Sequence, residues 1–212
     1  MPTTTTRTQT RQRQPTSAGT NGHDGNARRS ADPRYGELGR EVQRYGTLRD
    51  LPIGLPKEAR KSSCQMLNQV LADTNILYAL YKKAHWNVAG PTFYQLHLLF
   101  DKHAEEQLAL VDLLAERVQT LGGIAAADPR QIAEITGIQR APDGAEDVPA
   151  MITRLLQAHE IVIKEVRDGI EQTEQSKDWG SNDLLMSEVL RRNELQVWFV
   201  GEHLVDVPLL ED

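Results

Sequence analysis

Residues 81–123 read YKKAHWNVAGPTFYQLHLLFDKHAEEQLALVDLLAERVQTLGG, with histidines and carboxylates at spacings that a helix can present to a metal ion. Gly90-Pro91 interrupts the helical pattern, and Pro91 or Thr92 begins a second helix that runs to Leu121. Gly122-Gly123 then supplies a left-handed stop, which glycine adopts at little cost. The stretch therefore predicts the end of one helix, a corner and a second long helix.

The rest of the chain after residue 56 has the same helical character. Apolar residues recur at intervals of three and four, and few alternating stretches indicate strands. Asp128 and Asp147 are suitable N-caps, and Ser181 or Asn182 caps the last helix. The further predicted helices are Lys57–Asn87, 130–135, 147–178 and one that ends near Val205. We expect an all-α fold: an antiparallel four-helix bundle with a short helix in the connection between helices two and three.

Composition divides the chain into four parts. We expect a flexible basic arm (1–32), a surface strap (33–56), the helical bundle (57–205) and a short C-terminal tail (206–212). Residues 1–31 contain five arginines and one acidic residue, which give this segment a net charge of +4. Because the net charge of the whole chain is −6, residues 32–212 have a net charge of −10. An acidic body attracts cations, whereas a basic arm attracts nucleic acid.

Several classes of protein are excluded by composition. Cys64 is the one cysteine, so no disulfide can form within the chain and no cysteine cluster offers a structural zinc site. No apolar stretch approaches the ~20 residues that span a bilayer, and the N-terminus lacks the apolar core of a secretory signal. We therefore expect a soluble, cytoplasmic protein without a membrane partner.

The second helix carries two neighbouring stripes. Advancing 100° per residue from His97 places Asp101, Asp112, Glu105 and Glu116 between about 40° and 100°. An apolar stripe between about −40° and −120° contains Leu96, Phe100, Val111, Leu114, Val118 and Leu121. The polar stripe therefore lies beside the face that enters the core. A metal site inside the bundle is not expected either, because no histidine has a glutamate three residues before it.

Two interpretations fit a polar stripe outside the core: a solvated acidic face, or a metal site that another subunit covers. Asp112 and Glu116 stand four residues apart, a repulsion that a bound cation reverses. His85 and His97 flank the Gly90-Pro91 corner, and imidazole beside carboxylate suits Fe(II) or Zn(II). A zinc hydrolase, which needs three ligands and an open water position, fits these residues less well than a paired site shared by two chains.

The segment HWNVAGPTFYQLHLLFD, followed by Asp112, by AER at residues 115–117 and by LGG, closely resembles the signature of the Dps family of mini-ferritins. The resemblance covers about residues 57–205. It implies a ferritin-like bundle that assembles as a hollow homododecamer, with ferroxidase centres at two-fold interfaces. That location agrees with the position of the polar stripe.

The resemblance also implies a role for each ligand. His85, His97 and Asp101 come from one subunit, and Asp112 with Glu116 from its partner. Asp112 and Glu116 hold the tighter iron with His85, while His97 and Asp101 serve a weaker one. Trp86 resembles a family tryptophan that intercepts radicals, although a packed interface aromatic is an equal interpretation. Other family-based expectations are a supporting role for Glu105 and an iron-admitting pore near Glu171, Glu174, Asp178 and Asp183.

By this resemblance we expect the protein to oxidise Fe(II), preferably with hydrogen peroxide, and to store ferric mineral, which protects DNA. The alternative is a protein that mainly compacts DNA without sequence preference through its basic N-terminal arms. A nucleoid-associated location is the alternative to a free cytoplasmic one. Less favoured are an organelle transit peptide in the arm and a metal site in the tail formed by His23 and Asp24 with Asp32 or Glu37. His103, His159 and His203 lie apart from the stripe and are not assigned as ligands.

Overall fold

The computed structural model describes residues 40–205. The predicted arm (1–32), the first part of the predicted strap (33–39) and the predicted tail (206–212) lie outside the described residues. Every regular element within 40–205 is helical, which confirms the all-α prediction. No helix in that range is both long enough and apolar enough to cross a membrane.

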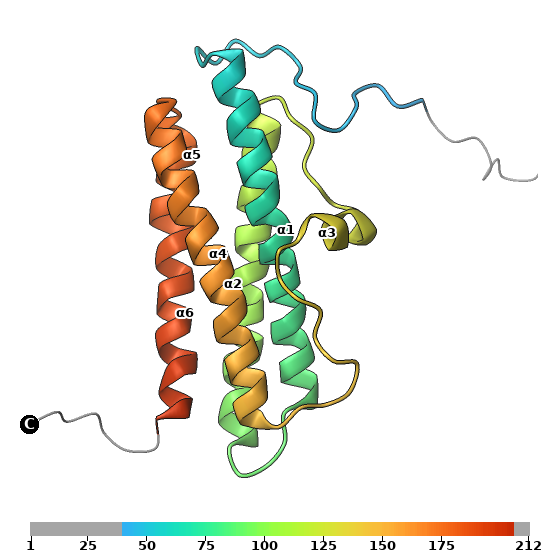
Figure 1. Ribbon diagram of the computed structural model, residues 1–212, viewed down its shortest axis with the longest axis vertical. Helices are drawn as coiled ribbons and strands as arrows, with labels where there is room; N and C mark the ends of the chain where they lie inside the picture. Colours follow the sequence, from blue (N-terminus) through green and yellow to red (C-terminus); the bar gives the residue numbers. More distant parts are fainter. Residues whose placement is uncertain (1–39, 206–212) are drawn as a thin grey trace, which may run out of the picture. The chain divides into compact units, whose positions relative to one another are not determined.

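Four long helical segments form the bundle (Figure 1). They are α1 (Lys57–Asn87), α2 (Phe93–Thr120), α4 (Val148–Gln175), and a fourth segment made of α5 (Trp179–Asp183), the π-helical η1 (Leu184–Leu190), α6 (Arg191–Gly201) and the 3-10 turn η2 (Glu202–Leu204). The antiparallel pairs are α1 with α2 and α4 with α6 (Figure 1). The long connection between α2 and α4 carries the short α3 (Pro129–Ile135), as predicted. It crosses the bundle so that α2 and α4 run in the same direction, which is the ferritin-like connection.

The predicted N-caps of α3 and α4 are confirmed. The Asp128 side chain accepts a hydrogen bond from the backbone N–H of Arg130, and the Asp147 side chain accepts one from Ala150. Each bond satisfies a backbone donor that the first helical turn leaves without a partner. Both helices begin where the sequence pattern places them because these caps depend only on residues two or three positions away.

The turn between the third and fourth long helices differs from the prediction. α4 ends at Gln175 rather than near Asp178, because Lys177 adopts a left-handed backbone with φ of 58°. The N-cap of the next helix is Asp178, not Ser181 or Asn182. The chain therefore reverses three residues earlier than predicted.

Asp178 caps this helix because a residue from α2 also binds it. The side chain is 1% exposed and accepts hydrogen bonds from Arg117 Nη2 at 2.6 Å and from the backbone N–H of Ser181 at 3.2 Å. A buried carboxylate is stable only when it is paired in this way. The Asp178 carboxylate is therefore buried and paired within the subunit. The other three acids expected at a pore, Glu171, Glu174 and Asp183, are exposed.

The apolar stripe of α2 enters the core as predicted. Leu96, Phe100, Leu114, Val118 and Leu121 are fully buried, and Val111 is half-buried against them. They pack against buried side chains of the other long helices, among them Leu67, Leu71, Leu77, Ile152, Leu155 and Leu185. The core therefore uses up one face of α2 and leaves the adjacent face outside.

The segment before α1 is fastened to the C-terminal end of α2. The backbone N–H of Arg49 donates to the carbonyl oxygen of Gly122 at 3.0 Å, and Gln43 Nε2 donates to the same oxygen at 2.9 Å. Arg60 Nη1 in turn donates to the carbonyl oxygens of Arg49 and Leu121. Gly122 has a φ of 88°, and a Cβ there would lie 2.6 Å from the oxygen of Arg49.

The connection that follows α3 is fastened to α1 through Asp73, which is fully buried. Its carboxylate accepts hydrogen bonds from Thr136 Oγ1 at 2.5 Å, from the Gly137 N–H at 2.8 Å and from Gln69 Nε2 at 2.6 Å. Burial, together with the neighbouring Asp73 carboxyl, raises the pKa of Glu165 on α4 to about 8. Protonation of Glu165 near neutral pH therefore removes the repulsion between its carboxyl group and that of Asp73.

Replacing Gly122 by alanine should destabilise the subunit, because alanine is strained at this φ and its methyl group meets the Arg49 carbonyl. We expect a loss of about 1–2 kcal/mol, which lowers the midpoint of thermal unfolding by roughly 2–8 °C. Gly144→Ala is the matched control, since a Cβ there meets nothing within 4 Å. Equal midpoints for the two variants would contradict this account of the strap.

Candidate metal centre

Two histidines meet at the corner between α1 and α2. His85 lies in the last turn of α1, and His97 lies near the start of α2. Gly90, with φ of 103°, reverses the chain between them. The two rings stack with their centroids 3.8 Å apart and their planes inclined by 19°. The predicted pair is therefore brought together within one chain.

Reciprocal hydrogen bonds orient both imidazole rings. His85 Nδ1 lies 2.8 Å from the carbonyl oxygen of His97, and His97 Nδ1 lies 2.9 Å from the carbonyl oxygen of His85. A carbonyl oxygen only accepts, so each Nδ1 must carry the proton. In the neutral ring this leaves Nε2 with its lone pair, which is the form in which histidine binds a metal ion.

Asp101 extends this pair by one helical turn. Its Oδ1 lies 3.9 Å from His85 Nε2 and 2.6 Å from Lys82 Nζ. The hydrogen bond from Lys82 holds the pKa of the Asp101 carboxyl below its ordinary value. Asp101 is therefore a carboxylate paired with an ammonium group, and a cation that binds there competes with Lys82.

The other two predicted ligands lie elsewhere on α2. Asp112 and Glu116 are exposed, as is Glu105 between them and Asp101. Asp112 follows Asp101 by eleven residues, which is about 16 Å along a helix axis. Within residues 40–205, no three His, Cys, Asp or Glu side chains are grouped so as to hold a metal ion. One chain thus presents two separate parts of the predicted ligand set.

Exposed aromatic side chains surround the histidine pair. Trp86 is 71% exposed, with Lys82 Nζ 5.7 Å from its ring centroid, and Tyr94 is 69% exposed. Phe93 lies against His97, with ring centroids 5.1 Å apart. Large aromatic groups gathered on a surface are typical of sites that another protein covers.

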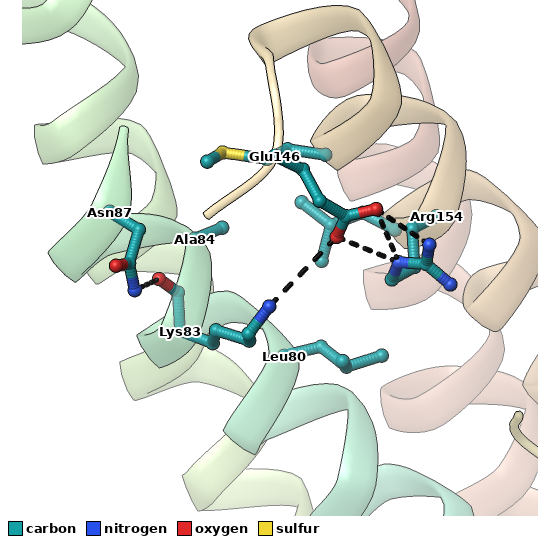
Figure 2. A pocket seen from close by; sticks show the side chains of 8 residues that line it. Leu80, Lys83, Ala84, Asn87, Glu146 and Arg154 are labelled. Carbon is teal, nitrogen blue, oxygen red and sulfur yellow. Dashed lines mark hydrogen bonds and ion pairs between the residues drawn. The ribbon is translucent and has the colours of Figure 1, made fainter. Parts of the chain in front are cut away.

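The nearby pocket in Figure 2 does not belong to this centre. Arg154 binds both oxygens of Glu146, with Nη2 2.6 Å from Oε1, and Lys83 Nζ lies 3.9 Å from Oε2 (Figure 2). The remaining space is about 20 Å³, room for roughly one water molecule. These residues join the end of α1 to the start of α4 and have a structural role.

Sequence reasoning missed one feature of this region. Lys82 was not assigned, although its position three residues before His85 puts it on the same side of α1. His103, which was not assigned as a ligand, is buried against Tyr81. His159 is also buried, whereas His203 is exposed.

Comparisons with known proteins show the family to which the chain belongs. The family model of the ferritin-like domain matches residues 64–210. DpsC from Streptomyces coelicolor superposes with a TM-score of 0.79 at 59% identity, covering 81% of this chain and all of that one. A nutrient stress-induced DNA-binding protein of Nostoc is 31% identical over 153 residues, which are 72% of this chain and 83% of that protein. The chain belongs to the Dps family of mini-ferritins.

A more distant Dps structure shares the same fold. The Dps protein of Vibrio cholerae, described as a member of a broad superfamily of ferritin-like diiron-carboxylate proteins, superposes with a TM-score of 0.70. It is 25% identical, and the match covers 75% of this chain and 99% of that one. The Dps assignment therefore applies to the whole bundle and not only to the corner motif.

Lys82→Met should strengthen the binding of a divalent cation at the histidine pair. The substitution removes an ammonium group that competes for Asp101, and an ion pair of this exposure contributes up to about 1 kcal/mol, or roughly fivefold in affinity. Co(II) is a suitable probe because its visible spectrum reports nitrogen and oxygen ligands. Lys83→Met is the control, since that ammonium group binds the Gly144 carbonyl and Glu146 instead. Equal Co(II) affinities for both variants would show that Lys82 does not compete.

Proposed function

We propose that the chain is the subunit of an iron-oxidising and iron-storing mini-ferritin whose ferroxidase centres form between two subunits. The observation that carries the proposal is the division of the ligand set along α2. His85, His97 and Asp101 lie at one end, and Asp112 with Glu116 lies about 16 Å further along. Each end alone is an incomplete site for a metal ion.

A two-fold axis completes both ends at once. When the α2 helices of two subunits pack antiparallel, the histidine end of each helix faces the acidic end of the other. Two equivalent centres result, each with two imidazole nitrogens and three carboxylates. The exposed Trp86, Phe93 and Tyr94 beside the histidine pair support an interface at this position.

The proposed ligands suit the oxidation of ferrous iron, which is the substrate. Carboxylates favour Fe(III) over Fe(II), and the Nε2 atoms provide nitrogen ligands in a fixed orientation. Two ferrous ions together give two electrons to hydrogen peroxide, which takes up two protons and becomes two water molecules. Because the electrons leave as a pair, no hydroxyl radical is released.

The charge of the chain supports the uptake of iron. The net charge of −6 contains the positive contribution of the arm, so the body is more acidic than the whole. An acidic surface raises the local concentration of Fe(II). A closed shell, proposed to be a dodecamer in the cytoplasm, would retain the ferric product as a mineral and keep it away from DNA.

Asp112→Asn combined with Glu116→Gln should abolish rapid iron oxidation, because the amides cannot supply the anionic ligands. Fe(II) is added anaerobically, hydrogen peroxide follows, and the ferric absorbance is recorded. We expect the initial rate to fall at least tenfold. Glu160→Gln with Asp168→Asn removes the same charge from exposed positions of α4 and should leave the rate unchanged. Normal oxidation by the first variant would overturn the site.

A second candidate function is DNA compaction. Residues 1–31 carry a balance of +4, and the Nostoc relative is named as a DNA-binding protein. One arm of this charge binds weakly, but an assembly that presents many arms contacts many phosphates at once. The acidic body opposes such binding, so the arms must supply it.

Replacing the five arginines of residues 1–31 by glutamine should abolish the retardation of plasmid DNA in a gel. For the unchanged protein, we expect retardation at low salt that weakens steeply as salt rises, because each phosphate contact releases a counterion. The glutamine variant should retain iron oxidation, which serves as its control. A failure of the unchanged protein to retard plasmid at low salt contradicts this second function.

A further inference from the structure

Tyr81 lies at the centre of the bundle and is fully buried. Its hydroxyl group lies 2.6 Å from His159 Nε2 on α4 and 3.2 Å from His103 Nδ1 on α2. His159 Nδ1 lies 2.9 Å from Asn193 Oδ1 on α6. All four long helices therefore contribute one residue to a polar cluster inside an otherwise apolar core.

The direction of each hydrogen bond follows from Asn193. Its Nδ2 donates to the Val189 carbonyl oxygen at 2.7 Å, so Oδ1 must face the other way, toward His159 Nδ1 and Gln107 Nε2. An amide oxygen only accepts, so His159 carries its proton on Nδ1 and has a lone pair on Nε2. Tyr81 must therefore donate its phenol proton to His159.

His103 completes the arrangement from the opposite side. Because the single Tyr81 proton is directed at His159, His103 Nδ1–H donates to the phenol oxygen. Burial lowers the pKa of His159 to about 3, so its ring is neutral at physiological pH. The cluster is a neutral tyrosine with a base already aligned to receive its proton.

We propose that Tyr81 and His159 form a redox-active pair that intercepts hydroxyl radical arising at the neighbouring metal centre. This inference rests on the proposed function, since the oxidant forms there when peroxide meets a single ferrous ion and takes only one electron from it. Tyr81 gives one electron to the hydroxyl radical, which becomes hydroxide. The phenol proton moves to His159 Nε2, and the products are a neutral tyrosyl radical and an imidazolium ion.

The geometry suits such a coupled step. An oxidised phenol that keeps its proton is a very strong acid, so its oxidation is easy only where a base is already in contact. The Asn193 oxygen, which accepts from His159 Nδ1–H, stabilises the imidazolium that forms. Tyr81 precedes His85 by four residues on α1, about 6 Å along the helix axis. The electron therefore has a short path through one helix.

Burial also protects the radical once it has formed. Tyr81, His159 and Asn193 are all 0% exposed, so small molecules and DNA cannot reach the phenoxyl oxygen.

A purely structural role for the cluster makes a different prediction. A buried tyrosine needs a hydrogen-bond partner whether or not it is oxidised. Under that role, Tyr81→Phe and His159→Gln change only stability. Glutamine is informative because its Oε1 can still accept from the Tyr81 hydroxyl but cannot take up the proton. A loss of tyrosyl radical in His159→Gln thus reports proton acceptance and not merely the loss of a contact.

The test uses the full-length protein with less than one Fe(II) per proposed centre, followed by peroxide, rapid freezing and electron paramagnetic resonance. We expect a tyrosyl signal, identified by ring deuteration, that falls at least fivefold in Tyr81→Phe and in His159→Gln. Tyr78→Phe on the same helix and Tyr94→Phe at the surface should keep it. An undiminished signal in Tyr81→Phe, or a wild-type radical on Trp86 alone, overturns the proposal.

A second experiment tests the Tyr81–His159 pair independently of the proposed ferroxidase function. The iron-free protein is oxidised by a photogenerated Ru(III) complex, which needs no metal centre. If Ru(III) produces a Tyr81 radical but the iron experiment gives no ferric product, the Tyr81–His159 pair is redox-active and the proposed ferroxidase function is wrong. If ferric product forms but neither experiment gives a Tyr81 radical, the proposed Tyr81–His159 pair is wrong and the proposed ferroxidase function is unaffected. Folding of each variant is checked by its circular dichroism and thermal midpoint.

Discussion

The reciprocal hydrogen bonds between His85 and His97 are the contact on which the rest of the centre depends. Each Nδ1 binds the other residue's carbonyl oxygen, so the end of α1 and the start of α2 are held in one register. The same bonds leave both Nε2 atoms with lone pairs. That register also brings Lys82 to Asp101 and places Tyr81 one turn before His85 of the proposed metal centre. A single backbone corner thus sets the ligand geometry and its distance from the core.

The interior of the bundle explains why the carboxylates lie outside it. In the described part of the chain, one buried polar cluster between the long helices consists of Tyr81, His103, His159, Asn193 and their glutamine neighbours, which largely satisfy one another. A neutral, paired set of this kind is stable in a low-dielectric core, whereas unpaired carboxylates are not. The acids of α2 therefore occupy the adjacent face, where a second chain or solvent must meet them.

The sequence predicted those features that depend on near neighbours. The caps at Asp128 and Asp147 need only the next three residues, and the two stripes of α2 need only its helical period. Asp178 was misjudged because its burial depends on Arg117, 61 residues away. The pairing of Lys82 with Asp101 likewise depends on how α1 and α2 align. The local sequence pattern does not show how two helices align with each other, and these contacts depend on that alignment.

Iron binding and assembly are thermodynamically linked in the proposed arrangement. Asp112 and Glu116 repel each other by a few tenths of a kcal/mol in the isolated chain, while Asp101 is already paired with Lys82. A cation held by ligands from two chains binds the assembled state and not the separated subunits, so it stabilises the interface by mass action. The acids that weaken the empty interface therefore strengthen the occupied one. Assembly becomes most stable where ferrous iron is abundant, which is also the condition in which the centre has substrate.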